Sequence, residues 1–251
     1  MRRAAIVTPL RTPVGTFGGS LRPVSVEELA ATTVRAVVEK SGIDPARIDD
    51  VVFAQSYASS ETPCVGRWAA LQAGLPVTVP GMQLDRRCGG GLQAVATAAM
   101  MVQSGAADVV IAGGVESMSN IEYYSTDMRW GARSGNVRFY DRLDRGRERS
   151  QPVERFGKIS GMIETAENLA RDYGISREAA DAYAVRSHQR AAAALGGPQQ
   201  FLAQGRQRSG FPLCRAGSGH PGRSFRGRHR REGRRHTPSH TRRLASGRRS
   251  R

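Results

Sequence analysis

Lysine is almost absent from this 251-residue chain: Lys40 and Lys158 are the only lysines among its 38 basic residues, and arginine supplies the rest. Cysteine is also scarce, with three residues at Cys64, Cys88 and Cys214. Their number and spacing give neither a paired disulfide framework nor a metal-ligand motif. These absences disfavour a disulfide-stabilised secreted domain and a zinc module. They favour a reducing compartment, so a cytoplasmic location is expected.

Long uninterrupted apolar runs are missing as well. Residues 89–107 carry no charge, but polar side chains and four glycines interrupt the run. A membrane span is therefore not expected. The first predicted strand, residues 4–7, starts so close to Met1 that we expect no signal peptide or transit segment.

Acidic residues and large apolar residues are rare in the C-terminal part of the chain. Residues 198–251 hold 15 Arg and one Glu, and they contain no Val, Ile, Met, Tyr or Trp. This composition cannot bury a core. We therefore predict a low-complexity, disordered basic tail over residues 197–251. A reading-frame shift in GC-rich DNA explains the tail economically, because such DNA read out of frame yields mainly Arg, Gly, Ala, Pro and Ser.

The same tail raises an alternative function. Arginines neutralise nucleic-acid phosphates, and binding of this kind is non-specific and weakens steeply with salt. The tail carries only scattered aromatic residues and no recognisable nucleic-acid-binding module. Nucleic-acid binding stays open here as the alternative to an enzyme.

The first 119 residues alternate between strand and helix patterns. Strands are predicted at residues 4–7, 50–55, 109–112 and in a run ending at Leu84; helices are predicted at residues 26–40, 64–73 and 92–103. Alternation of this kind favours an α/β fold with a mostly parallel sheet and helices on both faces. The helix at residues 92–103 is apolar or small on nearly every side, so we expect a further layer to cover it.

Cys88 lies at the turn between the strand ending at Leu84 and the helix that follows. A helix N-terminus favours the thiolate, which is the nucleophilic form of cysteine, and Arg86 and Arg87 add positive charge. Three glycines at 89–91 leave room for a substrate, whose carbonyl oxygen can then approach backbone donors, as in an oxyanion hole. A buried structural cysteine is the alternative interpretation.

Three stretches carry a resemblance to a known family. The run Leu84-Asp-Arg-Arg-Cys-Gly-Gly-Gly-Leu-Gln-Ala94 resembles the acyl-enzyme cysteine motif of the thiolases. The segments Arg11-Thr-Pro-Val-Gly-Thr-Phe-Gly-Gly19 and Gly113-Gly-Val-Glu-Ser-Met-Ser119 resemble two further thiolase motifs. Gly90 stands where many thiolases carry serine, and Asp85 where many carry asparagine. Both departures leave the nucleophile in place.

This resemblance implies a fold and a division into parts. Residues 1–119 would form the N-terminal α/β domain, half of a five-layer αβαβα fold, and residues 120–196 a loop domain that covers the active site and helps to hold coenzyme A. The run Met162-Ile-Glu-Thr-Ala-Glu-Asn168 is similar to a loop-domain motif of the family. By this resemblance Met162 would flank the bound thioester.

The implied activity is acyl transfer of the acetyl-CoA acetyltransferase type, with Cys88 as the acyl acceptor, acyl-CoA or acetyl-CoA as substrate and no other cofactor. A homo-oligomer and a place in fatty acid metabolism are implied as well. A decarboxylating condensing enzyme of the same superfamily is the closer rival. The family's second-half histidine and cysteine motifs are not found in proper context, so we expect a truncated chain with little or no turnover.

Overall fold

A computed structural model describes residues 2–159 and 161–196, and the predicted tail lies outside the described residues. The first part of the chain follows the predicted alternation closely. Its elements are α1 (Val26–Ser41), η1 (Pro45–Arg47), β1 (Asp50–Ala54), α2 (Val65–Gln72), β2 (Gly81–Leu84), η2 (Arg87–Gly89), α3 (Gly90–Ser104) and β3 (Val110–Gly114).

Local chemistry explains where these helices begin and end. Ser25 caps α1, because its Oγ accepts the N–H of Glu28 at 3.3 Å. The Glu28 carboxylate accepts a hydrogen bond from Arg35 at 3.0 Å. Gly42 and Gly105 end α1 and α3 in the left-handed conformation that glycine adopts without strain.

The three strands form one parallel sheet in the order β2-β1-β3. Val52 of the central strand is paired with Met82 on one side and with Ala112 on the other. Every residue of β1 is buried, as is typical of a strand covered on both faces.

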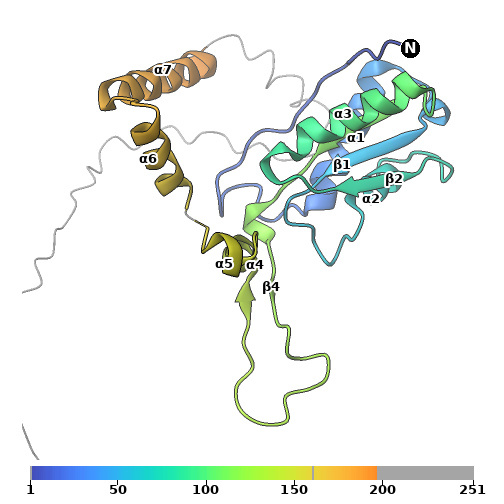
Figure 1. Ribbon diagram of the computed structural model, residues 1–251. Coiled ribbons are helices and arrows are strands. Elements are labelled where there is room, and N and C mark those ends of the chain that lie inside the picture. The colour runs from blue at the N-terminus through green and yellow to red at the C-terminus, as the bar shows by residue number, and fades with distance from the viewer. Residues whose placement is uncertain (1, 160, 197–251) are drawn as a thin grey trace, which may run out of the picture. The chain divides into compact units, whose positions relative to one another are not determined.

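Alternate side chains of β1 point into two different cores. Val51 and Phe53 pack with residues of α1 and α2, whereas Val52 and Ala54 pack with Ala94 of α3. The sheet and its helices therefore form three layers, with α1 and α2 on one face of the sheet and α3 on the other (Figure 1). This arrangement confirms the predicted α/β fold with helices on both faces.

Helix α2 lies against the sheet with almost no space between the two backbones. A Cβ at Gly66 would stand 2.3 Å from the carbonyl oxygen of Met82 and 2.7 Å from that of Val51. A Cβ at Gly81 would meet the backbone of Arg67 at 2.5 Å. Glycine at both positions is what permits this approach.

The strand predicted at residues 4–7 is wrong. These residues have no regular secondary structure and pair with no described strand. Ile6 and Val7 remain 77% and 73% exposed. A β-branched run becomes a strand only where it pairs with a sheet edge, and this segment pairs with neither of the two edge strands, β2 and β3.

The remaining elements are β4 (Tyr123–Tyr124), β5 (Tyr140–Asp141), α4 (Arg142–Glu148), α5 (Val153–Phe156), α6 (Met162–Asp172) and α7 (Arg177–Gly196), with η3 (Met118–Asn120) before them. Strands β4 and β5 form an antiparallel pair. The division at residues 119 and 196 stays a prediction. Within residues 2–159 and 161–196, no helix is both long and apolar enough to cross a membrane.

Candidate active site

Cys88 is the middle residue of η2, a short 3-10 helix that ends directly before the first residue of α3. Its side chain is exposed, so the buried structural interpretation is wrong. No side chain of the described residues caps the N-terminus of α3. The thiol is therefore presented to solvent beside a helix N-terminus, as the sequence pattern predicted.

The three glycines after Cys88 have different surroundings. The N–H groups of Gly89 and Gly90 already donate to the carbonyls of Arg86 and Arg87, which closes the 3-10 turn. These two amides are therefore engaged, contrary to a simple oxyanion-hole expectation. A Cβ at Gly91 would meet nothing within 4 Å, so the expected room for a substrate is present there.

The residue before Cys88 has an unusual backbone conformation. Arg87 has φ 47°, in the left-handed region, and it is one of two described non-glycine residues with positive φ. A side chain with a Cβ costs about 1–2 kcal/mol in this conformation. Such a conformation persists only where neighbouring groups hold it.

Contacts from two sides hold Arg87. Its N–H donates to Oδ1 of Asp85 at 2.7 Å, and its guanidinium donates to the carbonyl oxygen of Ser56 at 2.6 Å. The guanidinium also lies 5.4 Å from the centre of the Tyr57 ring. Asp85 Oδ2 stands 3.6 Å from the same guanidinium, so the positive charge expected beside Cys88 is partly neutralised.

Glu116 ties the end of β3 to the same loop. Its Oε2 accepts the N–H of Ser56 at 2.8 Å and that of Tyr57 at 3.4 Å. Burial of the carboxyl raises the pKa of Glu116 above its ordinary value of 4.5, and the charge of Asp85 raises it further, against the lowering effect of the two N–H groups. The carboxyl ends of β1, β2 and β3 are thus joined around Cys88.

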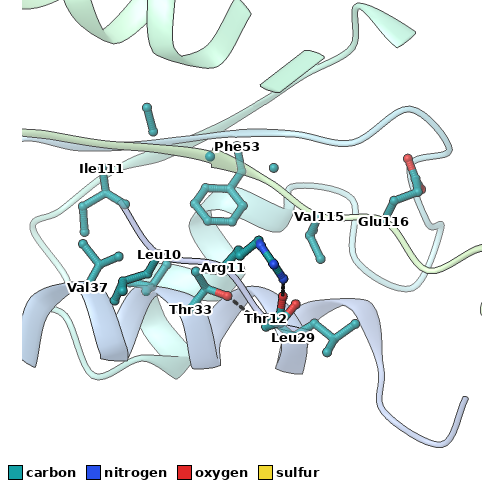
Figure 2. Close-up of a pocket in the computed structure, with 14 residues that line it drawn as sticks. Leu10, Arg11, Thr12, Leu29, Thr33, Val37, Phe53, Ile111, Val115 and Glu116 are labelled. Atoms are coloured by element: carbon teal, nitrogen blue, oxygen red, sulfur yellow. Dashed lines mark hydrogen bonds between the residues drawn. The ribbon is translucent and has the colours of Figure 1, made fainter. Parts of the chain in front are cut away.

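The other two thiolase-like segments meet close by. The N–H of Gly18 donates to Oγ of Ser119 at 2.9 Å. A pocket of about 220 Å³ is lined by Arg11 and Thr12 of the opening segment, by α1, by β3, and by Val115 and Glu116, which follow β3 (Figure 2). Cys88 does not line this pocket, so the pocket and the candidate nucleophile are separate features.

A second, smaller pocket of about 170 Å³ lies beside the loops that follow β1 and β3. Gln55, which is 3% exposed, is one of its lining residues. Oε1 of Gln55 is the buried side-chain polar atom without a hydrogen-bond partner among the described residues. Ligands of parallel α/β sheets bind at the carboxyl ends of strands, and this pocket lies there.

Two other residues from the sequence analysis occupy defined positions. Met162 is the first residue of α6 and is 80% exposed. Its role beside a thioester stays a prediction. Cys64 is half-buried at the start of α2, where its Sγ stands 3.4 Å from the carbonyl oxygen of Gly81. This agrees with the helix predicted at residues 64–73.

Sequence reasoning missed Ser56, Tyr57 and Glu116 as neighbours of the turn that carries Cys88. Glu116 belongs to a quoted motif, but nothing in that motif indicates that its carboxylate binds the loop after β1. The position of Ser56 and Tyr57 directly after a buried parallel strand was the available signal.

Comparisons with known proteins agree with this geometry. The family model described as "Thiolase, N-terminal domain" matches residues 4–201. An acetyl-CoA acetyltransferase of Chromobacterium violaceum is 41% identical over 190 residues, which is 76% of this chain and 47% of that protein. A probable acetyl-CoA acetyltransferase of Escherichia coli is 39% identical over 195 residues, 78% of this chain and 48% of that protein.

A solved structure agrees as well. The crystal structure of the Bacillus anthracis acetyl-CoA acetyltransferase superposes with a TM-score of 0.67 at 39% identity, over 74% of this chain and 46% of that one. The fold and the cysteine turn thus define an α/β protein of the thiolase type. The chain belongs to the thiolase family, and it spans about half the length of the relatives it matches.

Proposed function

We propose that this chain carries the acyl-accepting half of an acyl-CoA acyltransferase of the acetyl-CoA acetyltransferase type, with Cys88 as the nucleophile. The observation that carries the proposal is the exposed Cys88 thiol in a strained turn at the start of α3, within a sequence of the thiolase family. The names of the similar proteins support an acetyl-CoA thioester as substrate.

The chemistry is a transfer between two thiols. The Cys88 thiolate attacks the thioester carbonyl, the bond from the acyl carbon to the CoA sulfur breaks, and CoA leaves as a thiol that takes up a proton. The acyl group is then held on Sγ of Cys88 until a second nucleophile removes it. When the overall reaction runs in reverse, the same thiolate attacks the keto carbonyl of a 3-ketoacyl-CoA, the bond between C2 and C3 breaks, and acetyl-CoA leaves after C2 takes up a proton.

Turnover needs more than the nucleophile. By resemblance to the thiolases, a histidine removes the thiol proton and a second cysteine serves as acid and base, and both come from the half of the family sequence that this chain does not match. We therefore expect acylation of Cys88 without sustained turnover by this chain alone.

The test is release of CoA from acetyl-CoA by the purified chain, followed by chromatography. We expect a burst of about one CoA per chain and then a plateau, which is how acyl-enzyme accumulation behaves. Cys88→Ala is expected to abolish the burst, whereas Cys64→Ala retains it. A steady rate that persists in Cys88→Ala would refute the assignment.

A homo-oligomer and a place in fatty acid metabolism belong to the same proposal, because they follow from the family resemblance. A cytoplasmic location belongs to it as well, because the cysteine content favours a reducing compartment. Nucleic-acid binding gains no support from the comparisons. The arginines on which it depends lie in residues 198–251, outside the described part of the chain.

A further inference from the structure

The turn that carries Cys88 is linked to the ends of two neighbouring strands by a set of contacts that the acyl-transfer proposal does not use. Arg87 reaches from this turn to the loop after β1, and Glu116 reaches to the same loop from the end of β3. We infer that Arg87 and Glu116 are positioning residues, which together fix the backbone turn that presents Cys88. This inference rests on the proposed function only for its catalytic consequence.

The first step is the strain at Arg87. Its positive φ turns the chain sharply immediately before Cys88, so this dihedral angle contributes to the direction in which the thiol points. The hydrogen bond from the Arg87 N–H to Oδ1 of Asp85 stabilises the turn locally. A local hydrogen bond of this kind does not connect the turn to the rest of the sheet.

The second step is the connection through the side chain. The Arg87 guanidinium donates to the Ser56 carbonyl at 2.6 Å and lies over the Tyr57 ring at 5.4 Å. Arg87 and Asp85 are 53% and 45% exposed, so their ion pair contributes little by itself. The charge-assisted bond to a backbone carbonyl and the contact with the ring are the stronger links.

The third step fixes the loop that receives Arg87. Ser56 and Tyr57 donate their N–H groups to Glu116, so the carbonyl that Arg87 binds is on a segment already held from β3. On the other side of Tyr57, a Cβ at Gly146 of α4 would stand 3.2 Å from the ring. Tyr57 is therefore close to both Arg87 and α4.

Arg35 offers a matched control. Its guanidinium also donates to a backbone carbonyl, that of Gln72 at 2.9 Å, and pairs with the Glu28 carboxylate at 3.0 Å, but these contacts join α1 to the end of α2. Glu122 offers a control for Glu116, because it likewise accepts a backbone N–H, that of Ser60 at 2.9 Å.

The experiment is hydrogen exchange with mass spectrometry on the full chain and its variants. Arg87→Ala and Glu116→Ala are expected to speed exchange about tenfold in peptides covering residues 85–91, the effect of losing one charge-assisted hydrogen bond. Arg35→Ala and Glu122→Ala are expected to leave that segment unchanged. Glu116→Gln, whose amide oxygen still accepts N–H groups, is expected to restore slow exchange.

The second readout is the rate of acetyl transfer from acetyl-CoA to Cys88. Arg87→Ala and Glu116→Ala are expected to slow it about tenfold, with Glu116→Gln rescuing, while alkylation of the exposed thiol by iodoacetamide changes less than twofold. Unchanged exchange at residues 85–91 in Arg87→Ala, or equal acceleration in every peptide, overturns the inference. If the unsubstituted chain accepts no acetyl group, the proposed function fails, and the exchange result still decides the positioning role.

Discussion

Gly90 and Ala54 approach each other so closely that a Cβ built at Gly90 would stand 2.9 Å from the Cβ of Ala54. The contact joins the last residue of β1 to the first residue of α3, which lies two residues after the candidate nucleophile. A larger residue at 90, such as the serine that many thiolases carry, therefore requires a smaller neighbour at 54.

This contact predicts a coupled pair of substitutions. Gly90→Ala alone is expected to destabilise the chain by about 1–3 kcal/mol, because the new methyl group overpacks against Ala54. In an Ala54→Gly background the same change is expected to cost at least about 1 kcal/mol less. Urea unfolding of the two single variants and the double variant measures the coupling. Additive effects would contradict the packing account.

The contact of α2 with the sheet predicts a larger effect at Gly66. Gly66→Ala places a Cβ 2.3 Å from the Met82 carbonyl oxygen, and backbone atoms cannot move aside as a side-chain end can. We expect a loss of about 3 kcal/mol or more in the free energy of unfolding. Gly91→Ala is the matched control: its Cβ meets nothing within 4 Å, so it is expected to stabilise α3 by up to about 1 kcal/mol.

Glu116 predicts a pH dependence of stability. Its pKa is raised in the folded chain, so the folded state binds a proton more tightly than the unfolded state does. The stability that this group contributes is therefore complete below pH 4.5 and is lost as pH rises through the raised pKa. Relative to Glu116→Gln, which does not titrate, the unsubstituted chain is expected to lose stability over that window. Chemical unfolding of both proteins across pH measures the difference, and parallel curves would refute it.

Asp49 predicts a pH dependence of stability opposite in sign to that of Glu116. The N–H groups of Val109 and Asp108 donate to its carboxylate, at 2.9 Å and 2.6 Å, and lower its pKa below 3.8. Its contribution is present above pH 3.8 and is lost as pH falls through the lowered value. Because the carboxylate is exposed, Asp49→Ala is expected to cost only about 1 kcal/mol near neutral pH. The gap between the unfolding free energies of the two proteins should close in acid.

The sequence predicted the α/β layers because their signals are local. Ser25 and Gly105 mark helix ends, and the buried run of β1 is apolar on both faces. The strand predicted at residues 4–7 was wrong because strand formation depends on a pairing partner. Pairing partners are set by long-range contacts, which the β propensity of a segment does not encode.

Of the candidate site, only Cys88 could be predicted from the sequence. Cys88 follows from a motif, whereas the links from Arg87 to Ser56 and from Glu116 to Ser56 join residues that lie 31 and 60 positions apart. Only the parallel sheet brings such loops to one edge. The positive φ of Arg87 could not be foreseen, because arginine gives no local signal for it.

The most direct test of the central claim is peptide mass spectrometry of the purified 251-residue chain after brief exposure to acetyl-CoA. The account predicts an acetyl group on Cys88 and none on Cys64, and no acetylation of cysteine after heat unfolding. Acetylation of Cys64 and Cys88 to equal extents, or none on Cys88 while a full-length thiolase treated alongside is labelled, would contradict the claim that this turn presents an acyl-accepting nucleophile.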